Sequence, residues 1–137
     1  MSASRHADPS HPLSFLAFDF GTQRIGVASG STVTCTAQPL RTIAEPVATR
    51  FDAIGRLIAE WRPDALVVGV PCHPDGAPHD NTQRAKRFAR QLHGRFHLPV
   101  HEVDERYTTT EALASGAADV DAASAAIILE QFMSTLA

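Results

Sequence analysis

Carboxylates at three places in the chain are the residues best suited to chemistry. Asp19 interrupts the apolar segment 13–20, where an unpaired buried charge is costly, so it needs a partner or a cation. Asp104-Glu105-Arg106 closes a predicted strand, and strand carboxyl ends are where α/β sheets bind ligands. The simpler alternatives are that Asp19 caps the turn that follows it and that 104–106 is a solvated charged turn.

The third carboxylate, Asp121, begins the last predicted helix. It shares one face of that helix with Ala125, Ile128 and Phe132. Because this face is apolar, it must pack on the sheet and carry the carboxylate inward with it. The alternative is that Asp121 is a plain N-cap, a position that aspartate favours. Asp119, two residues earlier, could assist.

Carboxylates gathered at one site repel one another and raise one another's pKa values. A divalent cation removes this conflict, and carboxylate oxygens are hard ligands that select Mg²⁺ or Mn²⁺ rather than zinc. Two such ions, about 3.5–4 Å apart, would clamp the attacking and leaving oxygens of a phosphodiester. This is the chemistry of a nuclease.

The hydrophobic pattern predicts the elements that must position these groups. Short apolar or β-branched runs indicate strands, and apolar residues recurring at helical spacing indicate amphipathic helices, the first of which should bury Trp61 in the core. A meander followed by strand–helix–strand units predicts an α/β fold in which a five-stranded mixed sheet has helices on both faces. Strands are predicted at 13–20, 24–29, 31–38, 65–70 and 99–104, the last at a sheet edge, and helices at 46–61, 81–95, 108–116 and from 121 to about 136.

The length and composition of the chain indicate a single globular domain. The chain has 137 residues, 44% of them hydrophobic, and no apolar run of the roughly 18 residues that a membrane span needs. Residues 1–12 are polar and predict a disordered tail, which leaves 13–137 as a single domain. Two cysteines outside any CxxC pattern favour a reduced, cytoplasmic setting. A net charge of −3 argues against a protein that binds nucleic acid by bulk charge alone.

Four motifs together resemble one known family. The segment 18–28 (FDFGTQRIGVA) resembles the opening motif of the YqgF, or RuvX, family. Segments 67–71 (VVGVP), 104–109 (DERYTT) and 120–129 (VDAASAAIIL) resemble its later motifs, in the family's order and across nearly everything from residue 15 onward. The resemblance implies a ribonuclease H-like fold and a nuclease.

The same resemblance implies that the metal-binding and catalytic carboxylates are Asp19, Glu105 and Asp121. Members of the family are described as maturing the 5′ end of pre-16S ribosomal RNA, and earlier as candidate Holliday-junction resolvases. Nucleic acid is therefore the expected partner, with ribosomal particles as a further candidate, and the oligomeric state stays open. Many members carry Ser-Asp where this chain has Ser29-Gly30, so one auxiliary carboxylate is absent.

Arginines supply the candidate phosphate contacts. Arg24 and Arg106 flank the predicted metal site, although they could instead pair internally with Asp104 or Glu105. The helix 81–95 carries a basic surface that would add salt-sensitive, sequence-independent affinity, or would simply be solvated. Its candidate nucleic-acid-binding residues are Arg84, Arg87 and Arg90.

Two other functions compete with the nuclease. Segment 19–22 (DFGT) also resembles the first phosphate motif of actin-like ATPases and sugar kinases, but those proteins hold nucleotide between two such domains and this chain supplies one. The other is a non-catalytic nucleic-acid-binding module that assists ribosome assembly, against which the complete carboxylate set argues. The choice between RNA and DNA stays open, because fold and metal chemistry are shared.

Overall fold

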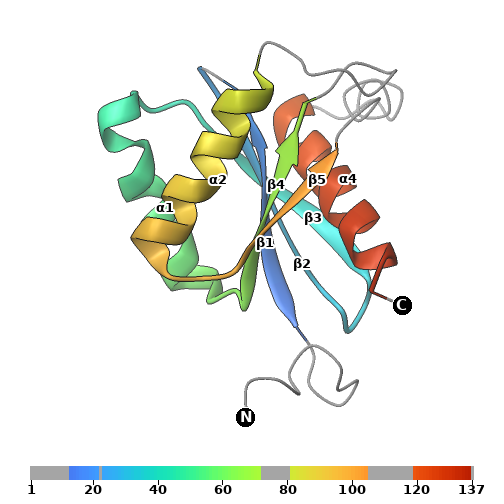
Figure 1. Ribbon diagram of the computed structural model, residues 1–137. Coiled ribbons are helices and arrows are strands. Elements are labelled where there is room, and N and C mark those ends of the chain that lie inside the picture. The colour runs from blue at the N-terminus through green and yellow to red at the C-terminus, as the bar shows by residue number, and fades with distance from the viewer. Residues whose placement is uncertain (1–12, 22, 72–80, 105–118, 137) are drawn as a thin grey trace.

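A computed structural model describes residues 13–21, 23–71, 81–104 and 119–136 (Figure 1). Five strands form one mixed sheet of order β3-β2-β1-β4-β5, in which β1, β2 and β3 are antiparallel and β4 and β5 run parallel to β1. The predicted helix at 108–116 lies outside the described residues. The elements are β1 (Ser14–Phe20), β2 (Ile25–Ser31), β3 (Thr36–Ile43), α1 (Val47–Trp61), β4 (Ala65–Val70), α2 (Thr82–Phe96), β5 (Val100–Asp104) and α4 (Val120–Ser134).

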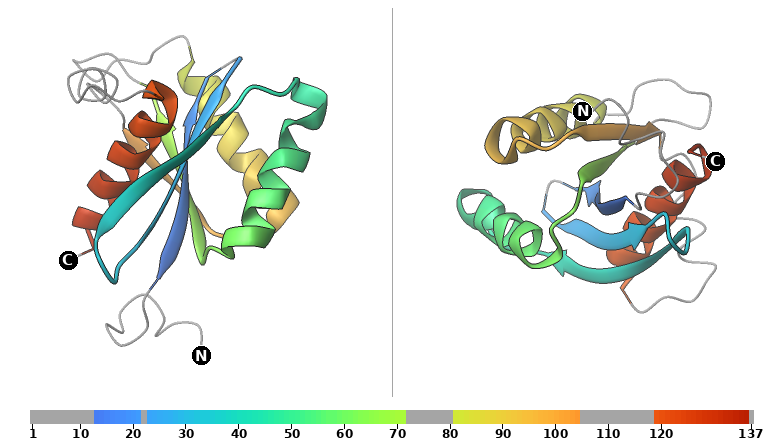
Figure 2. Two further views of the ribbon diagram at one scale, coloured as in Figure 1. Left: turned by 180° about the vertical axis from the view of Figure 1, so that it is seen from behind. Right: turned by 90° about the horizontal axis from the view of Figure 1, so that it is seen from below.

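The described helices lie in two layers on either side of the sheet. Helices α1 and α2 cover one face and α4 covers the other, as the view from below shows (Figure 2). The predicted five-stranded mixed sheet with helices on both faces is therefore confirmed. β5 is an edge strand as predicted, and His101 and Glu102 on it are exposed.

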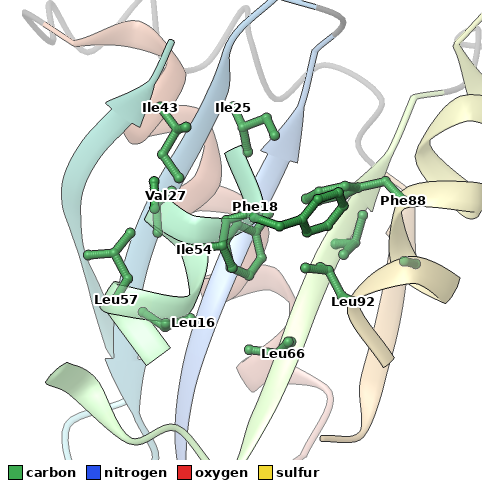
Figure 3. Packing of buried hydrophobic residues seen from close by; sticks show 14 residues of the cluster. Leu16, Phe18, Ile25, Val27, Ile43, Ile54, Leu57, Leu66, Phe88 and Leu92 are labelled. Atoms are coloured by element: carbon green, nitrogen blue, oxygen red, sulfur yellow. The ribbon is translucent and has the colours of Figure 1, made fainter. Parts of the chain in front are cut away.

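Alternation along β1 assigns its side chains to the two layers. Leu16 and Phe18 join the core beneath α1 and α2, where Phe88 packs edge-on against Phe18 with ring centroids 6.0 Å apart (Figure 3). Phe15 and Ala17 join a second cluster beneath α4. The sheet is thus buried on both faces at its centre, which explains why β1 and β4 are almost continuously apolar.

Two expectations about the first half of the chain were wrong. The third strand begins at Thr36 instead of residue 31, because β2 continues to Ser31 and the register pairs Ser31 with Thr36. The β-branched residues between them form the hairpin turn, which Cys35 closes with a positive φ of 54°. Trp61 is 38% exposed, because it lies in the last turn of α1, beyond the buried stripe that ends near Leu57.

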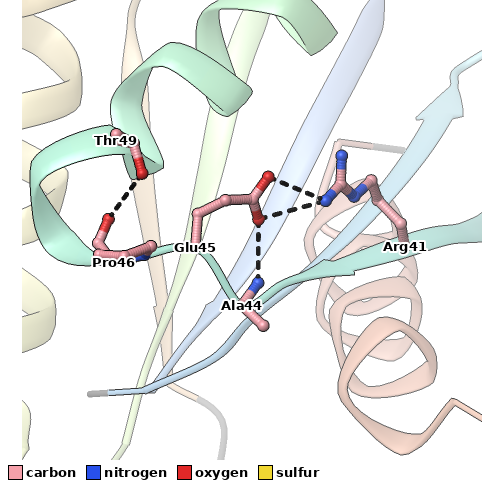
Figure 4. Close-up of polar contacts among 5 residues, drawn as sticks. All are labelled: Arg41, Ala44, Glu45, Pro46 and Thr49. Atoms are coloured by element: carbon pink, nitrogen blue, oxygen red, sulfur yellow. Dashed lines mark hydrogen bonds and ion pairs between the residues drawn. The ribbon is translucent and has the colours of Figure 1, made fainter.

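The junction between β3 and α1 is held by short-range polar contacts (Figure 4). The Glu45 carboxylate accepts hydrogen bonds from Arg41, at 3.3 Å, and from the backbone N–H of Ala44, at 3.2 Å. Pro46 is the N-cap, and its carbonyl accepts from the Thr49 hydroxyl. The helix therefore starts at Val47, one residue later than predicted.

Candidate active site

Asp19 lies on the α4 face of the sheet. It follows Phe15 and Ala17 in the alternation of β1, and both of those pack beneath α4. Its register partners are Gly26 on β2 and Gly69 on β4. The half-buried Asp19 carboxylate therefore has a glycine, and no neighbouring side chain, at the paired position on each adjacent strand.

The first turn of α4 lies directly on Gly26. A Cβ atom added there would be 1.9 Å from the carbonyl oxygen of Asp121 and 2.8 Å from the backbone nitrogen of Ala122. Paired residues on neighbouring strands have Cα atoms about 4.5–5.5 Å apart. Asp19 and Asp121, 102 positions apart in sequence, are therefore brought to the same end of the same face of the sheet.

Small residues on β2 make this close approach possible. Gly26, Ala28 and Gly30 all face α4, and Ala28 packs against Ala125 and Ala126. These small residues on β2 were not among the features predicted from the sequence. The signal was present as small residues at every second position between 26 and 30.

The Gly30 position is too far from Asp19 to supply an auxiliary ligand. Gly30 pairs with Phe15, four residues along β1 from Asp19, which is about 13 Å at the usual strand rise. An added Cβ at Gly30 would meet the Leu129 side chain at 2.9 Å and the Thr36 carbonyl oxygen at 2.8 Å. The glycine here serves packing, and its difference from the Ser-Asp of many family members removes no group from the site.

Arg24 forms an ion pair with Asp121. Its Nε lies 3.3 Å from Oδ2 of Asp121, and the two side chains are 66% and 32% exposed. The sequence alternative was that Arg24 pairs with Asp104 or Glu105, whereas the described partner is Asp121. An ion pair this exposed contributes about 0–1 kcal/mol to stability.

Asp119, rather than Asp121, caps α4. Its Oδ1 accepts a hydrogen bond from the backbone N–H of Ala122 at 3.0 Å and another from the Thr42 hydroxyl at 2.7 Å. Burial acts to raise the pKa of Asp119, but hydrogen bonds from Thr42 and the backbone, together with the Arg24 charge, hold it below its usual value. The alternative that Asp121 is a plain N-cap is therefore wrong, and the described partner of the Asp121 carboxylate is Arg24.

Replacing Asp119 should loosen the start of α4. We expect Asp119→Ala to lower the free energy of unfolding by about 1 kcal/mol, and Asp119→Asn to retain most of it because asparagine also caps. Because the pKa of Asp119 is lower in the folded than in the unfolded protein, its ionised carboxylate stabilises the fold above about pH 4. This stabilisation is lost as the pH falls through the folded-state pKa. Urea unfolding of both variants at pH 7 and pH 3 measures this. If the free energies of unfolding of Asp119→Asn and the unsubstituted protein differ more at pH 3 than at pH 7, Asp119 does not stabilise the helix as an ionised N-cap.

The three arginines predicted on the helix 81–95 are not gathered with Asp19 and Asp121. Arg84, Arg87 and Arg90 are exposed on α2, which packs on the opposite face of the sheet (Figure 2). The α2 helix nevertheless begins at the end of the sheet where β4 ends, since the Thr82 hydroxyl donates to the carbonyl of Pro71 at 2.6 Å. Its first turn is thus at the same end of the sheet as Asp19, which pairs with Gly69.

Glu105 and Arg106 lie outside the described residues. Glu105 directly follows β5, whose Val103 packs in the α4-side cluster and is in register with Gly69. Within the described ranges, no group of three or more histidine, cysteine, aspartate or glutamate side chains is arranged to hold a metal ion. Asp19 and Asp121 are the two described carboxylates of the predicted set, and their oxygen donors suit a hard divalent cation.

Known proteins resemble this chain over almost its whole length. Residues 13–135 match the sequence model of the family described as RuvX: Holliday junction resolvase. A protein of Polaromonas sp. named "Putative pre-16S rRNA nuclease" is 66% identical over 122 residues, which cover 89% of this chain and 88% of that protein. A relative of the same name from Burkholderia pseudomallei is 54% identical over 134 residues, covering 93% and 92%.

Solved structures share the fold. Thermus thermophilus RuvC, solved in complex with a Holliday junction substrate, aligns with a TM-score of 0.58 and 16% identity, over 90% of this chain and 95% of that one. RuvC has a ribonuclease H-like fold, so the predicted fold class is confirmed. Among the described helices, none is long and apolar enough to cross a membrane. With its motifs in order, this fold and a family match from residue 13 to 135, the chain belongs to the RuvX family.

Proposed function

We propose that this protein is a nuclease that hydrolyses phosphodiester bonds with the help of Mg²⁺ or Mn²⁺ held by Asp19, Glu105 and Asp121. The observation that supports the proposal is that Asp19 is paired with Gly26 while the backbone of Asp121 lies against Gly26, so both aspartates belong to one end of one face of the sheet. Two carboxylates at one end of one face need a cation or a cationic partner to offset their repulsion. The family match supports the same chemistry, and the fold agrees with that of RuvC, solved with a Holliday junction substrate.

The assignment of Glu105 rests on its motif, because Glu105 lies outside the described residues. It is the second residue of segment 104–109 (DERYTT), which resembles the family motif that supplies a carboxylate. The described strand β5 ends one residue earlier, and its Val103 lies in the α4-side cluster in register with Gly69, the β4 partner of Asp19. Glu105 would complete the set of three carboxylates that the motifs imply.

The protein's own residues would have distinct tasks in the reaction. When bound, the divalent cation would supply charge neutralisation for the phosphate oxygens of the transition state. Asp19, on the rigid central strand, and Asp121, on a helix capped by Asp119, would hold it in fixed geometry. Gly26 would let the first turn of α4 approach the strand beside Asp19, so that both aspartates can share the cation.

We propose precursor 16S ribosomal RNA as the substrate, processed near its 5′ end in the cytoplasm, and ribosomal particles as the associated partner. Relatives up to 66% identical carry the name of a pre-16S rRNA nuclease. The second candidate is a four-way DNA junction, which the family description and the RuvC structure favour. Asp19, Asp121 and the sheet would serve either polymer, because the cleaved group is the same phosphodiester.

A side-by-side cleavage assay tests the function. Purified protein is incubated with Mn²⁺ or Mg²⁺ on precursor 16S rRNA, an unstructured RNA and a four-way DNA junction. We expect metal-dependent cleavage of the precursor, suppressed by a chelator. Preferential cleavage of the junction would make the four-way DNA junction the substrate in place of the precursor RNA. Binding of ATP without cleavage of any polymer would favour the actin-like ATPase alternative instead.

Substrate binding should weaken steeply with salt, and α2 should contribute to that dependence. We expect the triple variant R84A/R87A/R90A to reduce the slope of log affinity against log salt by up to about 2, since each phosphate contact with single-stranded RNA adds roughly 0.7. Fluorescence anisotropy with labelled RNA between low and moderate salt measures the slope. Arg56→Ala on the exposed side of α1 is the control, and a triple variant with the unsubstituted protein's slope would exclude α2 from the binding surface.

A further inference from the structure

We propose that Arg24 is a displaceable counter-ion of the active site. It neutralises Asp121 while no divalent cation is bound, and cation binding releases it to contact a phosphate of the substrate backbone. The inference rests on the proposed function, because it assumes that Asp121 is a cation ligand. It adds a positioning role for Arg24 and a reason why cation and substrate should bind cooperatively.

The ion pair occupies the carboxylate that the cation requires. Nε of Arg24 is 3.3 Å from Oδ2 of Asp121, and Asp121 is next to Gly26 and thus near Asp19. A guanidinium stays charged at every physiological pH, so the pair cannot relax by losing a proton. A divalent cation on Asp121 would therefore meet a positive charge that must move away or oppose its binding.

The structure leaves Arg24 free to move. Its side chain is 66% exposed, and the ion pair is made through Nε. The start of α4 is already held by Asp119, which accepts hydrogen bonds from Thr42 and Ala122. The Arg24–Asp121 pair is therefore not needed to anchor the helix, which distinguishes it from a structural bridge.

A phosphodiester is the partner that fits the released side chain. The planar guanidinium donates paired hydrogen bonds whose spacing matches two phosphate oxygens. Arg24 precedes β2 by one residue and lies beside the proposed cation site, where the backbone of a bound substrate must pass. Its release would thus couple the arrival of the cation to the binding of the polymer.

Arg24→Gln keeps a hydrogen-bond donor near the position of Nε but removes the charge, so it separates the two roles. We expect it to bind Mn²⁺ about ten-fold more tightly than the unsubstituted protein, as measured by calorimetry without RNA, because the competing charge is gone. At saturating Mn²⁺, we expect its KM for precursor rRNA to rise roughly five-fold. Its affinity for labelled RNA without metal should be unchanged, since Arg24 is then occupied by Asp121.

Arg56→Ala on α1 is the matched control, because it removes one exposed arginine far from the site and should change none of the three quantities by more than about two-fold. If Arg24→Gln binds Mn²⁺ equally well or more weakly, Arg24 does not compete with the cation and the inference is overturned. The inference is also overturned if Arg24→Gln loses RNA affinity in the absence of metal by the same factor by which its KM rises at saturating Mn²⁺. If the unsubstituted protein binds no Mn²⁺ at all, the proposed function itself fails.

Discussion

Asp19→Asn should abolish metal-dependent cleavage while leaving the fold intact. The substitution preserves the shape of a side chain on the central strand and removes the negative charge that would hold the cation. We expect a loss of at least about 10²–10³-fold in kcat, the size seen when one preorganised stabilising group is removed. Without metal, the variant should be as stable as the unsubstituted protein or more so, because repulsion with Asp121 is relieved.

Cleavage rates on precursor rRNA, with thermal unfolding measured with and without Mn²⁺, test this prediction. Asp52→Asn, the same chemical change on the exposed side of α1, should leave cleavage at its normal rate. Adding Asp121→Asn to Asp19→Asn should reduce the rate little further, as expected for groups that act as one unit. If Asp19→Asn cleaves the RNA as fast as the unsubstituted protein does, the proposal of a metal-dependent nuclease that uses Asp19 is wrong.

Gly26→Ala should have the largest effect on the structure. An added Cβ would lie 1.9 Å from the carbonyl oxygen and 2.2 Å from the carbonyl carbon of Asp121, and backbone atoms of a capped helix cannot yield by rotating a side chain. The start of α4 must therefore move away from the sheet. We expect a loss of about 1–3 kcal/mol in the free energy of unfolding, the usual range for overpacking.

The same displacement should carry Asp121 away from Asp19, so Gly26→Ala should also weaken Mn²⁺ binding and cleavage. Gly94→Ala is the matched control: it lies within α2 with nothing inside 4 Å of an added Cβ, so we expect a gain of about 0.5–1 kcal/mol and unchanged cleavage. Urea unfolding compares the two variants, and calorimetry with Mn²⁺ on the folded protein reports the site. Equal stability of Gly26→Ala and the unsubstituted protein would show that α4 does not rest on this strand position.

Local sequence patterns determined most of the secondary structure. The run at 65–70 coincides with β4, because a strand buried on both faces is continuously apolar and the residues beside it are not. The third strand begins five residues later than predicted. The β-branched residues before it lie in the hairpin turn, although their residue types are typical of a strand. Where β2 ends is decided by pairing with a distant segment, which no local pattern contains.

The sequence by itself also determined the fold class, the family and the identity of the candidate carboxylates, since residue type and motif order are local information. Only the tertiary structure decided which groups meet. The register of β1 with β2 places Asp19 opposite Gly26, and the contact of α4 with Gly26 brings Asp121 beside it. The capping of α4 by Asp119 and the choice of Asp121 as the partner of Arg24 follow from that contact. These relations depend on strand register and on the distance between layers, which are set by the packing of the whole chain and have no signature within any one segment.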